Sequence, residues 1–273
     1  MRWAPSLASS SNDWAISGVF PSLSFVVSLG MAYPFCGSYR RSWEFSYPKD
    51  TPPLWFWQST TFDYNSASTM SKPMRITIVN VGYRSTNYWV VSAGTSRLLV
   101  DLGWPGTMGK MRANLRRMGV PLNEIRYGLA THYHIDHAGL AQELKQAGVP
   151  LLVLDVQVGA IPVMKTWTKP QDRYVDITMH DNVIISFPES RPMLERIGIP
   201  GEIVHTPGHS DDSVSLLLDD GSVFTGDLTP PAYAGESSAD VVSTSWRLLR
   251  ERGATRVYPA HGPVRPTDAE SIA

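Results

Sequence analysis

Near the middle of the chain stands the stretch Thr131-His132-Tyr133-His134-Ile135-Asp136-His137-Ala138-Gly139, in which three histidines and an aspartate fall within six positions. Imidazole is the commonest metal ligand in proteins near neutral pH, and carboxylate groups bind the same divalent cations. An exposed histidine-rich loop is the alternative interpretation. A soluble core has no use for so many ionisable groups, so the stretch predicts a metal site.

The segments on both sides of this stretch alternate between short strand patterns and amphipathic helix patterns. A strand at 125–130 runs directly into the histidines, and a helix at 138–146 follows them. The other expected strands are 74–81, 88–92, 97–101, 151–154, 183–187, 202–205, 213–218, 222–225 and 256–258, and the other expected helices are 108–118, 156–167, 192–197 and 239–252. Runs of strands with interspersed helices predict an α/β (α+β) fold, with two sheets and helices packed outside them.

The spacing within the stretch predicts two metal positions. His132 and His134 lie two residues apart just beyond a strand, so both side chains can point the same way. Asp136 and His137 lie in the turn that begins the next helix, where they can reach a second position. A catalytic zinc usually takes three protein ligands and leaves one position for water. Further ligands are therefore required elsewhere in the chain.

Three candidates for these ligands follow expected strands. They are His209 in Thr206-Pro207-Gly208-His209, Asp227 in Phe224-Thr225-Gly226-Asp227-Leu228, and His261 in Tyr258-Pro259-Ala260-His261. Each is a histidine or an aspartate beside a small residue or close to a proline. Two other histidines are interpreted differently: His205 as structural, and His180 as a solvated surface residue.

Together with Leu99-Val100-Asp101-Leu102-Gly103, these segments resemble the metallo-beta-lactamase-fold hydrolase superfamily over about residues 74–266. The resemblance implies a four-layer αβ/βα sandwich with its site at one edge, between the two sheets. It implies that one metal is held by His132, His134 and His209, and the other by Asp136, His137 and His261, with Asp227 bridging the two. Asp101 would orient a ligand histidine or a water.

The implied cofactor is a pair of zinc ions per chain, with iron or manganese as alternatives. Two zinc ions lower the pKa of a shared water towards about 7, so that a metal-bridging hydroxide forms and can attack a carbonyl group. The resemblance gives Asp136 a catalytic as well as a ligand role, because it would also orient this nucleophile. Tyr233, which follows Asp227 closely, is the candidate acid for the leaving group.

The expected function is a dinuclear zinc-dependent hydrolase of a small ester, thioester or lactone. The bridging Asp227 resembles the ester, thioester, lactone or phosphodiester branches of the superfamily more than typical beta-lactamases, which usually lack that carboxylate. The alternatives are a mononuclear iron sulfur dioxygenase, a phosphodiesterase, a beta-lactamase, and a non-catalytic metal-binding protein on the same fold. Asp211 and Asp212, which follow His209, are interpreted as a solvated turn, or else as charges that repel anionic substrates.

Composition narrows the classes of partner. The formal net charge is -1, and no basic run is interleaved with aromatic residues. The sequence therefore lacks the electrostatic signature of a nucleic-acid-binding protein, and a small-molecule substrate is expected, with no membrane partner. The single cysteine, Cys36, excludes both an intrachain disulfide framework and a cysteine-rich zinc site.

The first 70 residues differ from the rest of the chain. Serine occupies 15 of the first 73 positions, and no sustained strand or helix period occurs there. We expect a disordered or weakly ordered extension before a hydrolase domain at 74–266. A cytoplasmic location is expected, with an export or anchoring signal in residues 1–35 as the alternative. Met70 or Met74 could be the start of the working protein.

Overall fold

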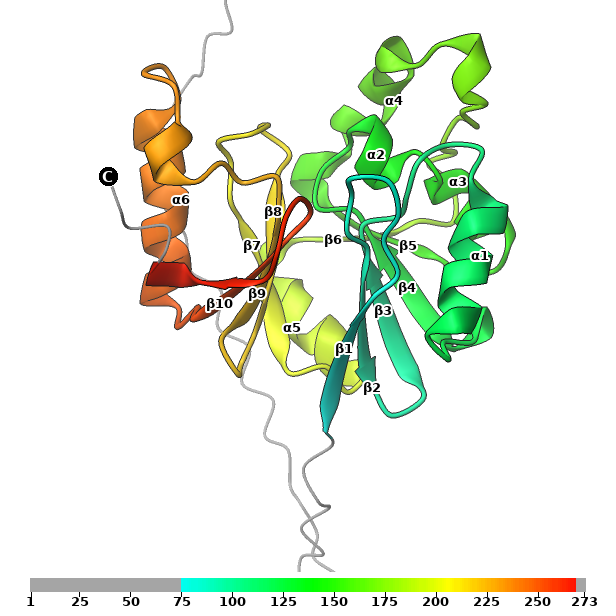
Figure 1. Ribbon diagram of the computed structural model, residues 1–273, viewed down its shortest axis with the longest axis horizontal. Coiled ribbons are helices and arrows are strands. Elements are labelled where there is room, and N and C mark those ends of the chain that lie inside the picture. The colour runs from blue at the N-terminus through cyan, green and yellow to red at the C-terminus, as the bar shows by residue number, and fades with distance from the viewer. Residues whose placement is uncertain (1–74, 269–273) are drawn as a thin grey trace, which may run out of the picture. The chain divides into compact units, whose positions relative to one another are not determined.

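The fold consists of two β-sheets and the helices that cover them. The computed structural model describes residues 75–268. The predictions for residues 1–70, and Cys36 with them, therefore lie outside the described residues. Figure 1 shows the two sheets side by side, with helices to the right of one and to the left of the other.

The first sheet contains strands β1 to β6 in chain order. Its first two pairs are antiparallel hairpin neighbours, and the following three pairs are parallel. Parallel neighbours need a crossover connection, and helices provide it here. The strands are β1 Ile76–Asn80, β2 Trp89–Ala93, β3 Ser96–Val100, β4 Ile125–Leu129, β5 Leu151–Leu154 and β6 Val183–Ile185.

The second sheet takes the rest of the chain, in the order β11-β10-β9-β8-β7. Helix α5, Phe187–Arg196, lies between the last strand of the first sheet and the first strand of the second. Only β9 and β10 are parallel neighbours, and α6, Ala239–Glu251, connects them. The strands are β7 Gly201–His205, β8 Val214–Leu218, β9 Ser222–Gly226, β10 Arg256–Pro259 and β11 Arg265–Pro266.

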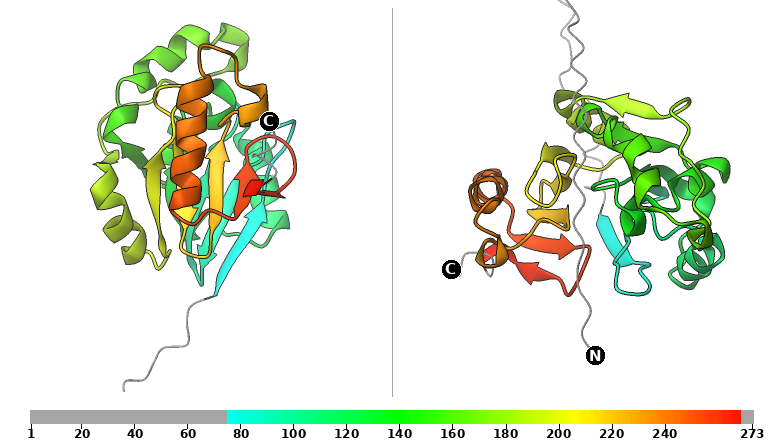
Figure 2. Two further views of the ribbon diagram at one scale, coloured as in Figure 1. Left: turned by 90° about the vertical axis from the view of Figure 1, so that its left-hand side faces the viewer. Right: turned by 90° about the horizontal axis from the view of Figure 1, so that it is seen from above.

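Alternation of side chains along the strands produces the layers. In β3, Leu98 and Val100 face a core shared with Leu216 of β8, between the sheets. Leu99 points the other way, into a core that helices α1 to α4 cover. On the outer side of the second sheet, Trp246 of α6 is fully buried. The result is the predicted four-layer αβ/βα sandwich, seen from two further sides in Figure 2.

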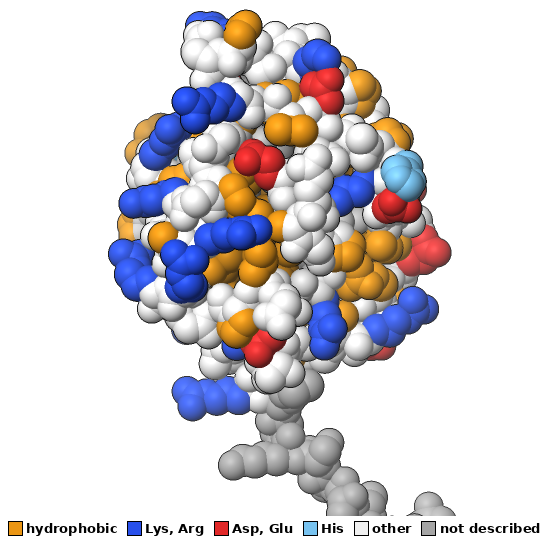
Figure 3. Space-filling view, turned by 90° about the vertical axis from the view of Figure 1, so that its right-hand side faces the viewer, with side chains coloured by type: hydrophobic (Ala, Val, Ile, Leu, Met, Phe, Trp, Pro, Cys, Tyr) orange, Lys and Arg blue, Asp and Glu red, His pale blue; other side chains and the backbone are white. Residues whose placement is uncertain are grey.

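Helix α1, Met108–Arg117, shows why the outer helices form where they do. Met111 and Leu115 are buried against the first sheet, whereas Lys110, Arg112 and Arg116 are exposed. Lys and Arg side chains are spread over this face of the molecule (Figure 3). The longest helix among the described residues is α6, with 13 residues. No helix of that part of the chain reaches the roughly 20 apolar residues that a membrane span needs.

Three expected helices differ from those observed. The helix at 138–146 is two helices, α2 Ile135–Ala138 and α3 Ala141–Gln146. The helix at 156–167 is a short α4, Ala160–Met164, flanked by 3-10 turns at Asp155–Gln157 and Lys165–Trp167. The helix expected at 192–197 begins earlier, at Phe187, and contains Pro192.

The early start of α5 has a local cause. Glu189 Oε2 accepts hydrogen bonds from the backbone N–H of Ser186, at 2.8 Å, and from its hydroxyl, at 2.7 Å. This is the Ser-x-x-Glu arrangement that caps a helix N-terminus. The cap fixes the first turn at Phe187, and the proline five residues later does not end the helix.

Candidate metal centre

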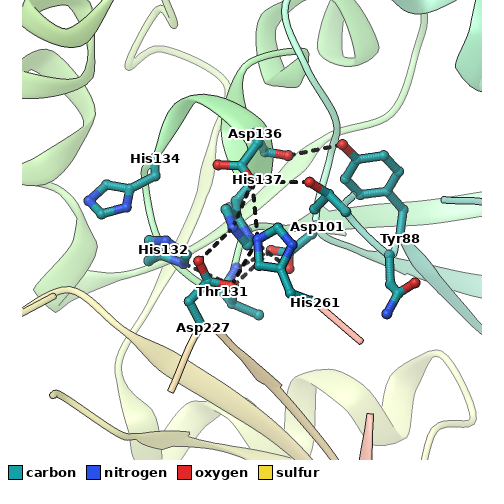
Figure 4. A network of polar contacts seen from close by, with 12 residues as sticks. Tyr88, Asp101, Thr131, His132, His134, Asp136, His137, Asp227 and His261 are labelled. Atoms are coloured by element: carbon teal, nitrogen blue, oxygen red, sulfur yellow. Dashed lines mark hydrogen bonds and ion pairs between the residues drawn. The ribbon is translucent and has the colours of Figure 1, made fainter. Parts of the chain in front are cut away.

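The seven predicted ligands lie on loops at one edge of the two sheets. His132, His134, Asp136 and His137 follow β4, and the last two lie in α2. The loop between β7 and β8 carries His209, Asp227 directly follows β9, and His261 lies just beyond the end of β10. In Figure 4 the side chains of Asp136, His137, Asp227 and His261 point toward one another.

The potential ligand atoms form three overlapping groups, each with its atoms within 4.8 Å of one another. The first group is His132, His134 and His209; the second is His132, His137 and Asp227; the third is Asp136, His137 and His261. The groups share His132 and His137, so they form one continuous cluster. The structure thus brings together all seven residues that the sequence analysis singled out.

Asp227 lies between the two outer groups. Its Oδ2 is 3.3 Å from Nε2 of His137 and 3.7 Å from Nε2 of His209. Its Oδ1 is 3.3 Å from Nε2 of His261. Because the two oxygens of one carboxylate face histidines of both groups, Asp227 has the position that a bridging ligand requires.

Several atoms of the cluster are buried and lack a hydrogen-bond partner among the described residues. They are Nε2 of His132, Nε2 of His137 and Oδ1 of Asp227. A buried polar atom without a partner is costly and rare in a folded protein. Cations bound within the cluster would give all three atoms a partner, and a set of imidazoles and carboxylates suits zinc and iron. The residues present therefore fit a metal pair.

Burial and neighbouring charges set the ionisation states within the cluster. Burial lowers the pKa of His132 well below its ordinary value, and the neighbouring His137 adds to this. Burial opposes protonation of His137 as well, but carboxylates, Asp101 first among them, outweigh it and raise its pKa. In Asp136 and Asp227 burial acts toward a higher pKa, but His137 outweighs it, so the pKa of both carboxyls is lowered. Both carboxylates are ionised at neutral pH, and His132 keeps a free lone pair.

Asp101 orients the most buried histidine. Its Oδ2 is 3.0 Å from Nδ1 of His137, which leaves Nε2 of that ring facing the other ligands. Its Oδ1 accepts hydrogen bonds from the backbone N–H and the hydroxyl of Thr131, both at 2.8 Å. The backbone of Asp101 adopts a φ of 61°, in the left-handed region. Such strain clusters at functional sites, and here it accompanies a carboxylate that binds both Thr131 and His137 of the histidine stretch.

The sequence analysis missed Thr131 and Gly226, which set how closely the two sheets approach. A Cβ on Gly226 would lie 2.3 Å from Oγ1 of Thr131, and the φ of this glycine is 56°. Only glycine fits such a position. The absence of a side chain allows the end of β9, and with it Asp227, to approach the end of β4. The sequence signal was present in Thr225-Gly226-Asp227, but the partner of the glycine was not predictable.

Sequence reasoning also missed a clasp formed by the loop between β1 and β2. Asn87 Nδ2 donates to the carbonyl oxygens of Pro259, at 3.0 Å, and Gly262, at 2.8 Å. Nδ1 of His261 donates to the carbonyl oxygen of Ser85, at 2.7 Å. Thr86 donates to Oδ2 of Asp136, at 3.0 Å. The loop therefore joins the first sheet to the His261 loop of the second.

Replacing Asn87 with leucine is expected to weaken metal binding about 10- to 100-fold, because partners that orient ligands contribute on that scale. Leucine cannot donate to Pro259 and Gly262, so the loop that carries His261 loses its anchor. Titration of the metal-free chain with zinc against a chelating dye measures the effect. The matched control is Asn182→Leu, which removes the hydrogen bond that Oδ1 of Asn182 accepts from Lys145, at 2.8 Å, outside this loop. Equal affinities of the two variants would contradict the clasp.

The Asp211-Asp212 pair is not a uniformly solvated turn. Asp212 is buried, and its Oδ2 accepts a hydrogen bond from the backbone N–H of Tyr133 at 2.8 Å. The interpretation as a solvated turn is therefore wrong for Asp212. Its hydrogen bond joins the loop that carries His209 to the histidine stretch that follows β4. Asp211 is exposed, and its carbonyl oxygen lies 2.8 Å from Nε2 of His205.

A cavity of about 680 Å³ opens beside the cluster. His209, Asp227 and His261 line it together with Tyr233 and Arg265. Tyr233 is 81% exposed and lies in a 3-10 turn, Pro231–Tyr233, shortly after β9. Its hydroxyl is therefore accessible to a molecule bound in this cavity.

Several known proteins are similar in sequence to this chain. Beta-lactamase-like protein 2 homolog of Caenorhabditis elegans is 27% identical over 195 residues, which cover 69% of this chain and 60% of that protein. An atrochrysone carboxyl ACP thioesterase of Aspergillus fumigatus is 30% identical over 188 residues, which cover 66% of this chain and 38% of the fungal protein. The chain thus spans less than two thirds of the length of either relative.

The fold also matches solved structures. TTHA1623, crystallised in a di-iron-bound form, aligns with a TM-score of 0.54 and 23% identity over 71% of this chain and 96% of that one. The family model of the metallo-beta-lactamase superfamily matches residues 81–261, a range that includes all seven predicted ligands. With this match and the shared fold, the chain belongs to the metallo-beta-lactamase superfamily.

Proposed function

We propose that this chain is a dinuclear metal-dependent hydrolase, with zinc as its resident metal, that acts on a small ester, thioester or lactone. The observation that carries the proposal is the position of Asp227 between the two outer ligand groups, with its carboxylate facing His137, His209 and His261. His132, His134 and His209 would hold one metal. Asp136, His137 and His261 would hold the other.

When bound, such a metal pair supplies a water nucleophile at neutral pH and polarises the substrate carbonyl. The chain's own residues supply orientation. Asp101 fixes the ring of His137, and Thr86 fixes the carboxylate of Asp136. Water adds to the acyl carbon and the bond to the leaving oxygen or sulfur breaks, which yields a carboxylic acid and an alcohol or thiol. Tyr233 stands in the adjoining cavity as the donor of the proton to the leaving atom.

A small-molecule substrate, or a small group on a carrier, suits the size of this cavity, because ligand sites commonly measure about 300 to 1,000 Å³. Among the ester-like classes, thioesters have the most support. Several relatives are named as ACP thioesterases, including the Aspergillus fumigatus protein described above. A mononuclear iron sulfur dioxygenase is the second candidate, and the di-iron form of TTHA1623 is the reason to measure iron as well as zinc.

The test is metal analysis of the purified chain, followed by a hydrolysis screen over thioesters, aryl esters, lactones, phosphodiesters and beta-lactams. We expect about two zinc ions per chain and turnover of thioesters or esters that a chelator removes and zinc restores. One iron per chain with oxygen consumption would instead establish the dioxygenase. Two bound metals without turnover of any of these substrates would leave a non-catalytic metal-binding protein.

A further inference from the structure

The segment from Asp155 to Trp167 presents two apolar faces. Val158 and Gly159, which join the first two of its three short helical pieces, have right-handed helical dihedral angles, as does Lys165 at the start of the third. Side chains three or four residues apart therefore lie on one face. Ile161 and Met164 form the first face and are buried in the core that covers the first sheet.

The second face is mostly exposed among the described residues, although Ala160 within it is half-buried against the core. Val156, Ala160, Val163 and Trp167 follow one another at intervals of four, three and four residues. The side chain of Val163 is 48% exposed and that of Trp167 is 67% exposed. Gathered apolar side chains at a surface mark a binding site more often than chance exposure does.

This second face forms one wall of a cavity of about 340 Å³. The opposite wall includes Tyr133 and His134 of the histidine stretch. Nδ1 of His134 lies 3.0 Å from Nε2 of His209, which lines the larger cavity. The two neighbouring histidines thus stand between the two cavities. A substrate whose reacting bond lies at the metal centre can extend from it into the cavity beside Trp167.

The charged residues that line this cavity limit which ligand groups it can bind. Among the described residues that line it, Asp211 and Asp212 are carboxylates, and there is no lysine or arginine. A negatively charged group would face like charges, which is unfavourable. The volume falls in the range of small-ligand sites. An uncharged hydrocarbon or aromatic group matches both the apolar wall and the charge.

We infer that the cavity formed by Val156, Val163 and Trp167 binds an uncharged apolar group of the substrate, next to the bond that is hydrolysed. The inference rests on the proposed hydrolase function and names the substrate class as esters or thioesters with a hydrocarbon or aromatic substituent. That substituent belongs either to the acyl side or to the leaving-group side of the bond, and the experiment separates the two.

The test uses two substrate series with the full chain and its metal. In one, the acyl group grows from two to ten carbons on a fixed thiol; in the other, the thiol grows on a fixed acetyl group. We expect kcat/KM to rise about two- to fourfold per methylene in one series until the cavity is filled, mainly through a lower KM. The series that shows the rise identifies which side enters the cavity. A flat response in both series would overturn the inference.

Variants test whether the dependence of kcat/KM on chain length arises from the apolar wall of this cavity. Trp167→Ala and Val163→Ala are expected to flatten the dependence on chain length, with an unchanged urea midpoint, because both side chains are exposed. The matched control is Val241→Ala on α6, where the valine is 45% exposed and lies outside this cavity. It should keep the wild-type dependence. If Val241→Ala flattens the response as much as Val163→Ala does, the assignment to this cavity is wrong.

A separate measurement distinguishes failure of the inference from failure of the proposed function. Methyl ketones from 2-butanone to 2-decanone are uncharged and cannot be hydrolysed, and calorimetry measures their binding to the zinc-loaded chain. If no substrate is hydrolysed but 2-decanone binds, and Trp167→Ala weakens that binding at least about fivefold, the cavity assignment stands and the hydrolase proposal fails. If esters are hydrolysed without chain-length dependence and 2-decanone does not bind, only the cavity assignment fails.

Discussion

Replacing Asp227 with alanine is expected to lower metal affinity by at least about 100-fold and to remove turnover to background. Loss of a partner that merely orients a ligand costs about 10- to 100-fold, and Asp227 faces histidines of both outer groups at 3.3 to 3.7 Å. Without its carboxylate, the two groups keep only neutral imidazoles and Asp136 to balance the charge of two cations. Metal content after dialysis against a chelator, followed by kcat/KM at fixed free zinc, measures both effects.

Asp240→Ala is the control for this substitution, because Asp240 is an exposed carboxylate in the first turn of α6 that joins none of the three ligand groups. It should bind metal as the wild type does. An Asp227→Ala chain that retains two tightly bound metals would disprove the bridging position.

Replacing Asp136 with alanine is expected to lower kcat/KM by about 100- to 10,000-fold, the range for loss of a group that handles the reacting proton. The Asp136 carboxylate is held by Thr86 and lies 3.3 Å from Nε2 of His261. Its loss removes one ligand of the second metal and the group that would orient the nucleophile. The other outer group, with His132, His134 and His209, stays complete, so one metal should remain bound.

Steady-state kinetics and metal analysis of the same Asp136→Ala preparation separate these effects. We expect about one metal per chain and a kcat that zinc in excess does not restore. The milder variant Thr86→Val keeps the carboxylate but removes its hydrogen bond, and should lose less activity. Unchanged activity of Asp136→Ala on every substrate found would refute the role given to this residue.

The sequence predicted that these side chains converge, because each candidate follows a strand at the same edge of a sheet. His209, Asp227 and His261 come from three loops far along the chain, yet strand ends in the second sheet place them beside the histidine stretch. Local sequence patterns could not predict the clasp that the loop between β1 and β2 forms. Asn87 acts through the carbonyl oxygens of Pro259 and Gly262, more than 170 residues away, and backbone acceptors leave no trace in side-chain patterns.

The predicted boundaries of several helices were wrong for a related reason. The stretch at 156–167 has helical spacing on both faces, but spacing alone does not show which face is covered by the core. The capping arrangement at Ser186 and Glu189 was readable in the sequence, whereas Pro192 suggested a later beginning of α5. The buried carboxylate of Asp212 accepts a hydrogen bond from the backbone of Tyr133, which follows β4 of the other sheet, and no local pattern shows this contact.

The division of the chain between the two sheets has a consequence for how the protein is assembled. Within residues 75–268, the first sheet is complete at Ile185 before the second begins at Gly201, and each contributes part of the cluster. Neither the segment that forms the first sheet nor the one that forms the second can therefore bind a metal pair until both have folded and packed together. A ligand that binds only the finished form stabilises it by mass action. Metal uptake should thus come late during maturation, after the two sheets have packed against each other.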